Sequence, residues 1–221
     1  MKKLITAAVL AGAMTLGSAN AALIDFANDA DTVGERGLTS GDPITIDGVN
    51  LILSASGSDG SVLFPYLDES LDGGFGNPAG LGVCRLLDAN AQCDDAGDDS
   101  VDGELGINEA ITIAFADGPI DIDGISFRNG AHNLINDSDL LVNFVVSGGA
   151  DATSGTDSFA NVVALFAAGL DDVTSLSFSF AGAQGSDFYI ESLTVPVPGA
   201  LPLLLSGIAG LGLAGRRKRA A

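Results

Sequence analysis

Residues 175–180 read Ser-Leu-Ser-Phe-Ser-Phe, an alternation of small polar and large apolar side chains that decides the fold class. Residues 111–115 repeat it as Ile-Thr-Ile-Ala-Phe, and residues 140–146 place four apolar side chains on one face of a third segment. Successive side chains of a β-strand point to opposite faces, so a period of two predicts strands that bury one face. These segments predict an all-β protein.

Further apolar segments extend this pattern, and clusters of Gly and Asp separate them, as is typical of turns between antiparallel strands. They are residues 23–26, 44–54, 61–66, 120–127, 159–166 and 188–195. No window has a convincing helical stripe, although residues 162–168 would allow one helical turn. About nine short strands with turns at regular intervals predict an antiparallel β-sandwich of jelly-roll type.

The first 21 residues have the composition of a secretory signal peptide. Two lysines precede an apolar run over residues 4–16, and Ala19-Asn20-Ala21 supplies small residues at the cleavage positions. We therefore predict export, with cleavage between Ala21 and Ala22. Residues 1–21 are accordingly excluded from the predicted fold.

The last 27 residues divide into three parts that are typical of a sorting signal rather than of a folded domain. The motif Val195-Pro196-Val197-Pro198 precedes an apolar stretch, residues 199–215, and the basic run Arg216-Arg217-Lys218-Arg219 follows. A helix over this stretch spans about 25 Å, enough for a short transmembrane helix. Basic residues favour the cytoplasmic side, so everything before Val195 is predicted to lie across the membrane.

This terminus resembles the PEP-CTERM family of bacterial sorting signals, and more closely its variant with a Val-Pro-Leu-Pro-Ala box. The resemblance covers residues 195–219, with Val197 where the family has Glu or Leu and Gly199 where the variant has Ala. It implies transient anchoring in the inner membrane, cleavage by an exosortase near Pro198, and release to the cell surface or the extracellular space. A simple C-terminal membrane anchor is the alternative.

The remaining residues, 22–194, are predicted to form one domain, and this domain is strongly acidic. It holds all 29 acidic residues but only three basic ones, Arg36, Arg85 and Arg128, which gives a formal charge of −26. Such a body repels nucleic acid and anionic polysaccharide unless divalent cations bridge them, so we expect no nucleic-acid partner. Solubility in salty or crowded surroundings and specific cation binding would both account for this charge.

Cys84 and Cys93 are the only cysteines of the chain. In an exported protein they predict a local disulfide. A metal-binding or nucleophilic thiol is the alternative, but no histidine lies nearby in the sequence, since the sole histidine is His132. His132 itself falls in a loop-like run, and we expect it to be solvated.

The Asp-rich loop from Asp98 to Glu109 is the candidate metal site. Asp98, Ser100, Asp102, Gly103 and Glu109 fall at positions one, three, five, six and twelve of an EF-hand loop. Oxygen donors at alternate residues wrap a Ca²⁺ ion, glycine allows the sharp bend, and a bidentate glutamate completes the shell. The flanking segments are predicted strands, so no helix pair accompanies the loop. We predict Ca²⁺ as the cofactor, with Asp98, Asp102 and Glu109 as ligands and Asp94, Asp95 and Asp99 as substitutes.

Enzymatic motifs are not found in the sequence. It has no Gly-x-Ser-x-Gly elbow, no His-Glu-x-x-His and no phosphate-binding loop. We therefore predict an exported, non-enzymatic protein of the cell surface or of an exopolysaccharide or biofilm matrix, with an exosortase and extracellular polysaccharide as partners. A carbohydrate-binding module or a glycan-acting hydrolase on the same sandwich fold is the alternative, although the chain has no tryptophan to stack on sugars.

Overall fold

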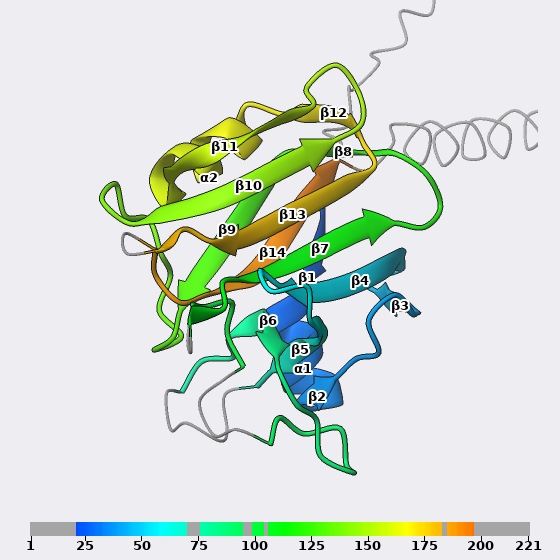
Figure 1. The fold of residues 1–221 in the computed structure, drawn as a ribbon. Coiled ribbons are helices and arrows are strands. Elements are labelled where there is room, and N and C mark those ends of the chain that lie inside the picture. Colours follow the sequence, from blue (N-terminus) through cyan, green and yellow to red (C-terminus); the bar gives the residue numbers. More distant parts are fainter. Residues whose placement is uncertain (1–20, 70–75, 95–98, 104–105, 183–184, 197–221) are drawn as a thin grey trace, which may run out of the picture. The chain divides into compact units, whose positions relative to one another are not determined.

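The computed structural model describes residues 21–69, 76–94, 99–103, 106–182 and 185–196. Figure 1 shows that strands dominate this part of the chain. In chain order the elements are β1 (Ala21–Asp25), α1 (Phe26–Val33), β2 (Arg36–Gly37), β3 (Pro43–Ile46), β4 (Val49–Gly57), β5 (Val62–Asp68), β6 (Gly80–Cys84), β7 (Glu109–Phe115), β8 (Ile120–Ile122), β9 (Gly124–Asn129), β10 (Leu141–Ser147), β11 (Thr153–Ser158), α2 (Phe159–Ala167), β12 (Leu170–Val173), β13 (Ser175–Phe180) and β14 (Phe188–Pro196).

Twelve of these strands form one sheet made of two groups that join where β4 pairs with β5. One group runs in the order β3, β4, β7, β13, β10, β11. The other contains β2, β5, β6, β14, β1 and β9. All of these pairs are antiparallel, and β8 and β12 form a separate antiparallel pair. The predicted all-β, antiparallel class is therefore confirmed. The jelly-roll connectivity is not shown by this strand order and stays a prediction.

The core lies between the two groups, as in a sandwich. The ring of Phe127 on β9 lies 5.4 Å from that of Phe178 on β13, centre to centre, and 5.1 Å from that of Phe159 on α2. These rings meet edge to face, which suits their quadrupoles. The predicted alternation of residues 175–180 is observed in its first four positions, since Leu176 and Phe178 are buried between half-buried serines.

The segment 159–166, predicted as a strand, is the helix α2. Its buried side chains, Phe159, Val162 and Phe166, are three and four residues apart and so share one helix face. The helix begins after Ser158, whose hydroxyl accepts a hydrogen bond from the backbone N–H of Asn161. The strand prediction was wrong here because a capping residue and a spacing of three to four outweigh a local apolar run.

The predicted strand 23–26 is observed one to two residues earlier, as β1, and the helix α1 after it was not predicted. Asp25 caps α1 by accepting a hydrogen bond from the backbone N–H of Asn28 at 2.9 Å. Phe26, Ala27 and Ala30 are the buried side chains of this helix. An Asp immediately before a short apolar face is a start signal that the sequence analysis missed.

The two ends of the described unit lie side by side. β1 pairs with β14 so that Ala21 is opposite Pro196 and Ala22 is opposite Val195. The strand β14 thus contains Val195 and Pro196, the first half of the predicted sorting motif. Val197, Pro198, the predicted transmembrane segment 199–215 and the basic run with Arg216 and Arg217 lie outside the described residues. Within the described ranges, neither helix has the length and apolarity needed to span a bilayer.

Candidate functional site

A group of polar side chains gathers where β5, β6 and β14 lie next to one another. Tyr66 and Asp68 come from β5, and Tyr189 comes from β14. Connecting segments supply the other members of this group, which we call the Asp68 cluster. The cluster comprises Glu35, Tyr66, Asp68, Asp99, His132 and Tyr189.

Asp68 and His132 are both buried in the cluster, with 4% and 3% of their surfaces exposed. The Oδ2 atom of Asp68 lies 3.1 Å from Nε2 of His132, within ion-pair distance. Nδ1 of His132 lies 2.8 Å from the carbonyl oxygen of Asn77. A carbonyl can only accept, so Nδ1 is the nitrogen that carries the proton in the neutral ring.

The prediction that His132 is a solvated loop residue was wrong. It does lie in the segment after β9, with a φ of +57°. Its ring, however, packs edge to face against Tyr189 with ring centres 5.5 Å apart. The loop turns inward because Asn129 accepts hydrogen bonds from the backbone N–H groups of Ala131 and Asn133.

Asp99 is held against β6 by a close backbone contact. The backbone N–H of Val83 donates to the carbonyl of Asp99 at 3.0 Å, and the Tyr189 hydroxyl donates to its carboxylate at 2.5 Å. A Cβ atom on Gly82 would lie 2.0 Å from the Asp99 carbonyl oxygen. Glycine at position 82 is therefore required for this approach.

Glu35 joins the cluster through Tyr66 and the disulfide loop. The Tyr66 hydroxyl donates to the Glu35 carboxylate, and the backbone N–H of Cys93 donates to the Tyr66 oxygen at 3.3 Å. Gln92 in the same loop donates from its amide to the backbone carbonyl of Glu35 at 2.9 Å. The predicted disulfide between Cys84 and Cys93 is confirmed, and it closes this loop.

The geometry brings three carboxylates together. One oxygen each from Glu35, Asp68 and Asp99 lies within 4.8 Å of the other two. Two of these residues are partly exposed and Asp68 is buried, so water screens their mutual repulsion only in part. Hard oxygen donors in such a group are the ligands that Ca²⁺ and Mg²⁺ prefer.

Burial and like charge perturb the ionisable groups of the cluster. Burial raises the pKa of Asp68, and the nearby charge of Asp99 adds to that effect. Burial also raises the pKa of Tyr66 and that of Tyr189, with contributions from Glu35 and Asp99 respectively. For His132, burial lowers the pKa, but hydrogen bonds to Asp68 and to the Asn77 carbonyl outweigh it and the net shift is upward. All four shifts retain protons in a region rich in negative charge.

The arginines of residues 21–196 make their ion pairs with other carboxylates. Arg36 pairs with Asp29, Arg85 with Asp102 and Glu109, and Arg128 with Glu191. The chain has no lysine between Lys3 and Lys218. Within the cluster, His132 is the cationic side chain that pairs with Asp68.

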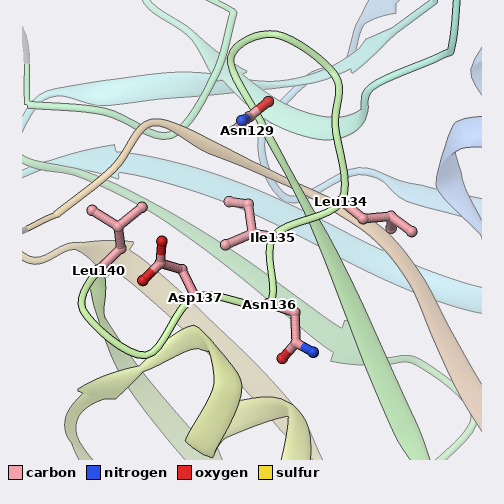
Figure 2. Close-up of a pocket in the computed structure, with 6 residues that line it drawn as sticks. All are labelled: Asn129, Leu134, Ile135, Asn136, Asp137 and Leu140. Atoms are coloured by element: carbon pink, nitrogen blue, oxygen red, sulfur yellow. The ribbon is translucent and has the colours of Figure 1, made fainter.

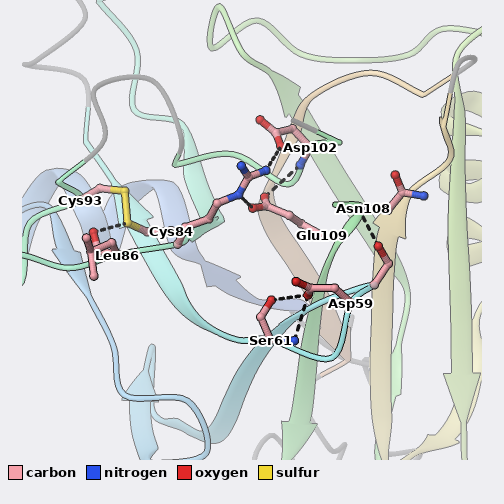
Figure 3. A network of polar contacts seen from close by, with 10 residues as sticks. Asp59, Ser61, Cys84, Leu86, Cys93, Asp102, Asn108 and Glu109 are labelled. Atoms are coloured by element: carbon pink, nitrogen blue, oxygen red, sulfur yellow. Dashed lines mark hydrogen bonds and ion pairs between the residues drawn. A yellow bond between two sulfur atoms is a disulfide. The ribbon is translucent and has the colours of Figure 1, made fainter. Parts of the chain in front are cut away.

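The predicted calcium ligands Asp102 and Glu109 lie close together, but both carboxylates form ion pairs with Arg85. The Arg85 guanidinium donates from Nε to Glu109 at 2.8 Å and from Nη2 to Asp102 at 3.3 Å. Figure 3 labels Asp102 and Glu109 and marks hydrogen bonds and ion pairs with dashed lines. The backbone N–H of Asp102 also donates to the Glu109 carboxylate at 3.2 Å. Asp98 and the substitute Asp95 lie outside the described residues. Calcium at this site stays a prediction, and an ion bound by these two carboxylates would have to displace the guanidinium.

A shallow pocket lies near the start of β10 (Figure 2). Its volume of about 190 Å³ is below the roughly 300–1,000 Å³ of typical ligand sites. Its acidic residue, Asp137, already accepts a hydrogen bond from the backbone N–H of Asp139 at 2.7 Å. We do not assign a function to this pocket, which is lined by Asn129, Leu134, Ile135, Asn136, Asp137 and Leu140.

No protein-family model, curated protein or solved structure matches this chain. Its site is therefore interpreted from geometry alone. From the sequence, Asp99 was predicted only as a substitute ligand, and Glu35 and Asp68 were not predicted as ligands. These two residues carried no local motif, because their proximity depends on which strands become neighbours.

Proposed function

We propose that this chain is an exported, non-enzymatic protein of the cell surface or extracellular matrix that is sorted by an exosortase. The observation that carries the proposal is the extent of the folded unit, which covers residues 21–196. This unit fills the interval between the predicted signal peptide and the predicted transmembrane helix. A passenger domain delivered by two terminal signals would have these boundaries.

The disulfide and the charge of the body support the same proposal. A disulfide between Cys84 and Cys93 suits an oxidising compartment outside the cytoplasm. A formal charge of −26 keeps such a body soluble and favours weak association with divalent cations, which could bridge it to acidic polysaccharide. Calcium is thus a natural cofactor for the proposed environment.

Intact mass spectrometry of the protein at the surface of its host tests the proposal. We expect a species that begins at Ala22 and ends near Pro198. A Pro198→Ala variant is the matched probe, because Pro198 belongs to the predicted motif but not to β14. This variant should accumulate in the membrane fraction with its basic terminus intact.

A surface species that still carries Arg216 to Arg219 would show a permanent anchor in place of exosortase sorting. A chain that retains residues 1–21 and stays in the cytoplasm would overturn the proposal as a whole. Glycan-array binding with and without Ca²⁺ tests the polysaccharide partner separately. The same array distinguishes a matrix protein from a carbohydrate-binding module, which would select defined sugars without the ion.

A further inference from the structure

We propose that the chain cleaves its own backbone between Asn77 and Pro78, with His132 as the catalytic residue. This reaction goes beyond the proposed function and is compatible with it, because a single cut in the chain's own backbone turns over no substrate. Asn77 and Pro78 lie in the segment just before β6, and Asn77 is exposed to solvent. Asn77 is the only asparagine of the chain that precedes a proline.

The following proline restricts the intramolecular chemistry of the Asn77 side chain. An asparagine ordinarily forms a succinimide when the backbone nitrogen of the next residue attacks its Cγ atom, which releases ammonia and leaves the chain intact. Proline has no backbone N–H, so this reaction is not available at Pro78. The remaining cyclisation is attack by Nδ2 of Asn77 on its own backbone carbonyl carbon. All five atoms of the resulting ring belong to Asn77, so no other segment has to supply the nucleophile.

The proposed reaction has two steps. In the first step, Nδ2 of Asn77 bonds to the carbonyl carbon, the bond from that carbon to the Pro78 nitrogen breaks, and a proton passes from Nδ2 to that nitrogen. The products are a chain that ends in a succinimide at Asn77 and a chain that begins with Pro78. In the second step, water hydrolyses the succinimide to a C-terminal asparagine or isoasparagine. No oxidant or reductant is consumed.

His132 lies where this attack requires a hydrogen-bond donor. Its Nδ1 atom lies 2.8 Å from the Asn77 carbonyl oxygen, to which it donates in the neutral and in the protonated ring alike. Negative charge develops on that oxygen when Nδ2 of Asn77 attacks, and a donor within about 2.7–3.1 Å stabilises this charge. Nε2 of the same ring lies 3.1 Å from Oδ2 of Asp68, so this carboxylate orients the ring. Asp68 is therefore a positioning residue.

The donor and the scissile bond are both held in place by the fold. Nη1 of Arg128 donates to the backbone carbonyl of His132 at 2.8 Å, and the His132 ring packs on Tyr189. Beyond the scissile bond, the backbone N–H of Ala79 donates to the Asp68 carbonyl at 3.2 Å, and Ala79 is buried. A donor that is fixed in advance costs no reorganisation when charge develops on its partner.

The two products should stay associated until the protein is denatured. The strand β5 precedes the cut and pairs with β6, which follows it. The disulfide between Cys84 and Cys93 lies entirely after the cut, so it does not link the two products. A denaturing gel should therefore separate them, whereas a native gel should not.

The test is a time course of the purified, folded full-length chain in detergent with protease inhibitors, read by intact mass spectrometry under denaturing conditions. We expect one product that begins with Pro78 and another that ends at Asn77 and is lighter by one water than the free acid. The missing water identifies the succinimide, because a protease leaves a free carboxylate. The rate constant should not depend on protein concentration, since the reaction is intramolecular.

Two variants at the scissile bond test the nucleophile and the leaving group. Asn77→Ala removes the nucleophile and should leave the chain intact. Pro78→Ala restores a backbone N–H, so the main product should change from a cleaved chain to an intact, deamidated one. Asn136→Ala, which replaces another exposed asparagine, is the control and should cleave at the wild-type rate.

A variant of His132 tests the donor. His132→Phe keeps a ring against Tyr189 but removes the N–H, and it should slow cleavage about a hundredfold. If this variant does not fold, wild-type protein unfolded in urea gives the same readout, because unfolding separates Asn77 from the histidine.

Three results would overturn the proposal. The first is a wild-type chain that yields no more of the Pro78 product than Asn77→Ala does. The second is undiminished cleavage in a folded His132→Phe variant, and the third is equal cleavage in folded and unfolded wild-type protein. None of them bears on export, because that test measures the outer ends of the protein, which this cut does not change.

Discussion

Gly82 on β6 is the single residue on which the position of Asp99 depends most directly. Gly82→Ala would place a methyl group 2.0 Å from the Asp99 carbonyl oxygen, so the backbone must shift. We expect a loss of about 1–3 kcal/mol in the free energy of unfolding, measured by chemical denaturation. Gly155→Ala is the matched control, because it also lies in a strand and its methyl group would make an ordinary contact at 3.6 Å. Equal stability of both variants would mean that the close approach of Asp99 to β6 does not exist in solution.

Arg85 neutralises Glu109, whose side chain is fully buried. Arg85→Ala leaves that carboxylate uncompensated, and we expect a loss of about 3–5 kcal/mol in the free energy of unfolding. Arg36→Ala is the control, because the Arg36–Asp29 pair is more exposed to water and should cost less than about 1 kcal/mol. Denaturation curves that rank the two variants the other way would contradict the assignment of Arg85 to a structural ion pair.

At the scale of residues, pairings between residues close in the sequence were predictable, whereas pairings between distant segments were not. Cys84 and Cys93 were predictable because no other partner exists and the pair is local. The partners of His132 were not, because Asp68 and Asn77 lie on segments more than 50 residues away. The sequence around His132 is typical of a solvated loop, and only its tertiary contacts bury the side chain.

At the scale of elements, the turn from β11 into α2 carries a pH dependence that can be measured. The side-chain amide of Asn161 and the backbone N–H of Ser158 donate to Asp157 and hold its pKa below the usual value. A pKa that is lower in the folded than in the unfolded chain stabilises the fold above the unfolded pKa, and this stabilisation is lost as the pH falls through the folded pKa. Asp157→Asn should therefore lower the free energy of unfolding relative to the wild type at neutral pH. This difference between the two proteins should shrink as the pH falls. Unfolding curves between neutral pH and pH of about 3 check this, and a constant difference across that range would contradict it.

Elements with an unambiguous period were predicted well, and ambiguous ones were decided by tertiary context. The alternation in residues 111–115 and 175–180 became β7 and β13 as expected. The similar sequences around Asp47-Gly48 and Asp123-Gly124 behave differently. Asp47 and Gly48 both have positive φ and turn β3 into β4, whereas β8 and β9 pair with β12 and β14 rather than with each other. The same local signal thus gives a hairpin only where the second strand stays beside the first.

At the scale of the whole molecule, the disulfide should stabilise the fold through the loop that it closes. It closes the loop whose residue Cys93 donates to Tyr66, and Tyr66 in turn donates to Glu35. Replacing both cysteines by serine should lower the free energy of unfolding by about 2–3 kcal/mol. Wild-type protein treated with reductant should lose stability to a similar extent, and an unchanged free energy of unfolding in either case would contradict this role of the disulfide.

The global arrangement was the least predictable part of the structure. The strand order β14, β6, β5 places Tyr189 beside Asp68, which is 121 residues earlier in the sequence. Local periodicity indicates which face of a strand is buried but contains no information on which strand lies beside it. The fold class therefore followed from the sequence, whereas the Asp68 cluster required the sheet.

The pairing of β1 with β14 has a mechanical consequence. Because Ala21 lies opposite Pro196, tension applied between these two ends loads the hydrogen bonds of the pair one after another. Such a pair peels open at low force, whereas a pull along the strand axis loads all of its hydrogen bonds together and resists far more. The body would therefore be compliant when stretched by both ends and stiff when pulled by Pro196 alone against contacts on a distant strand.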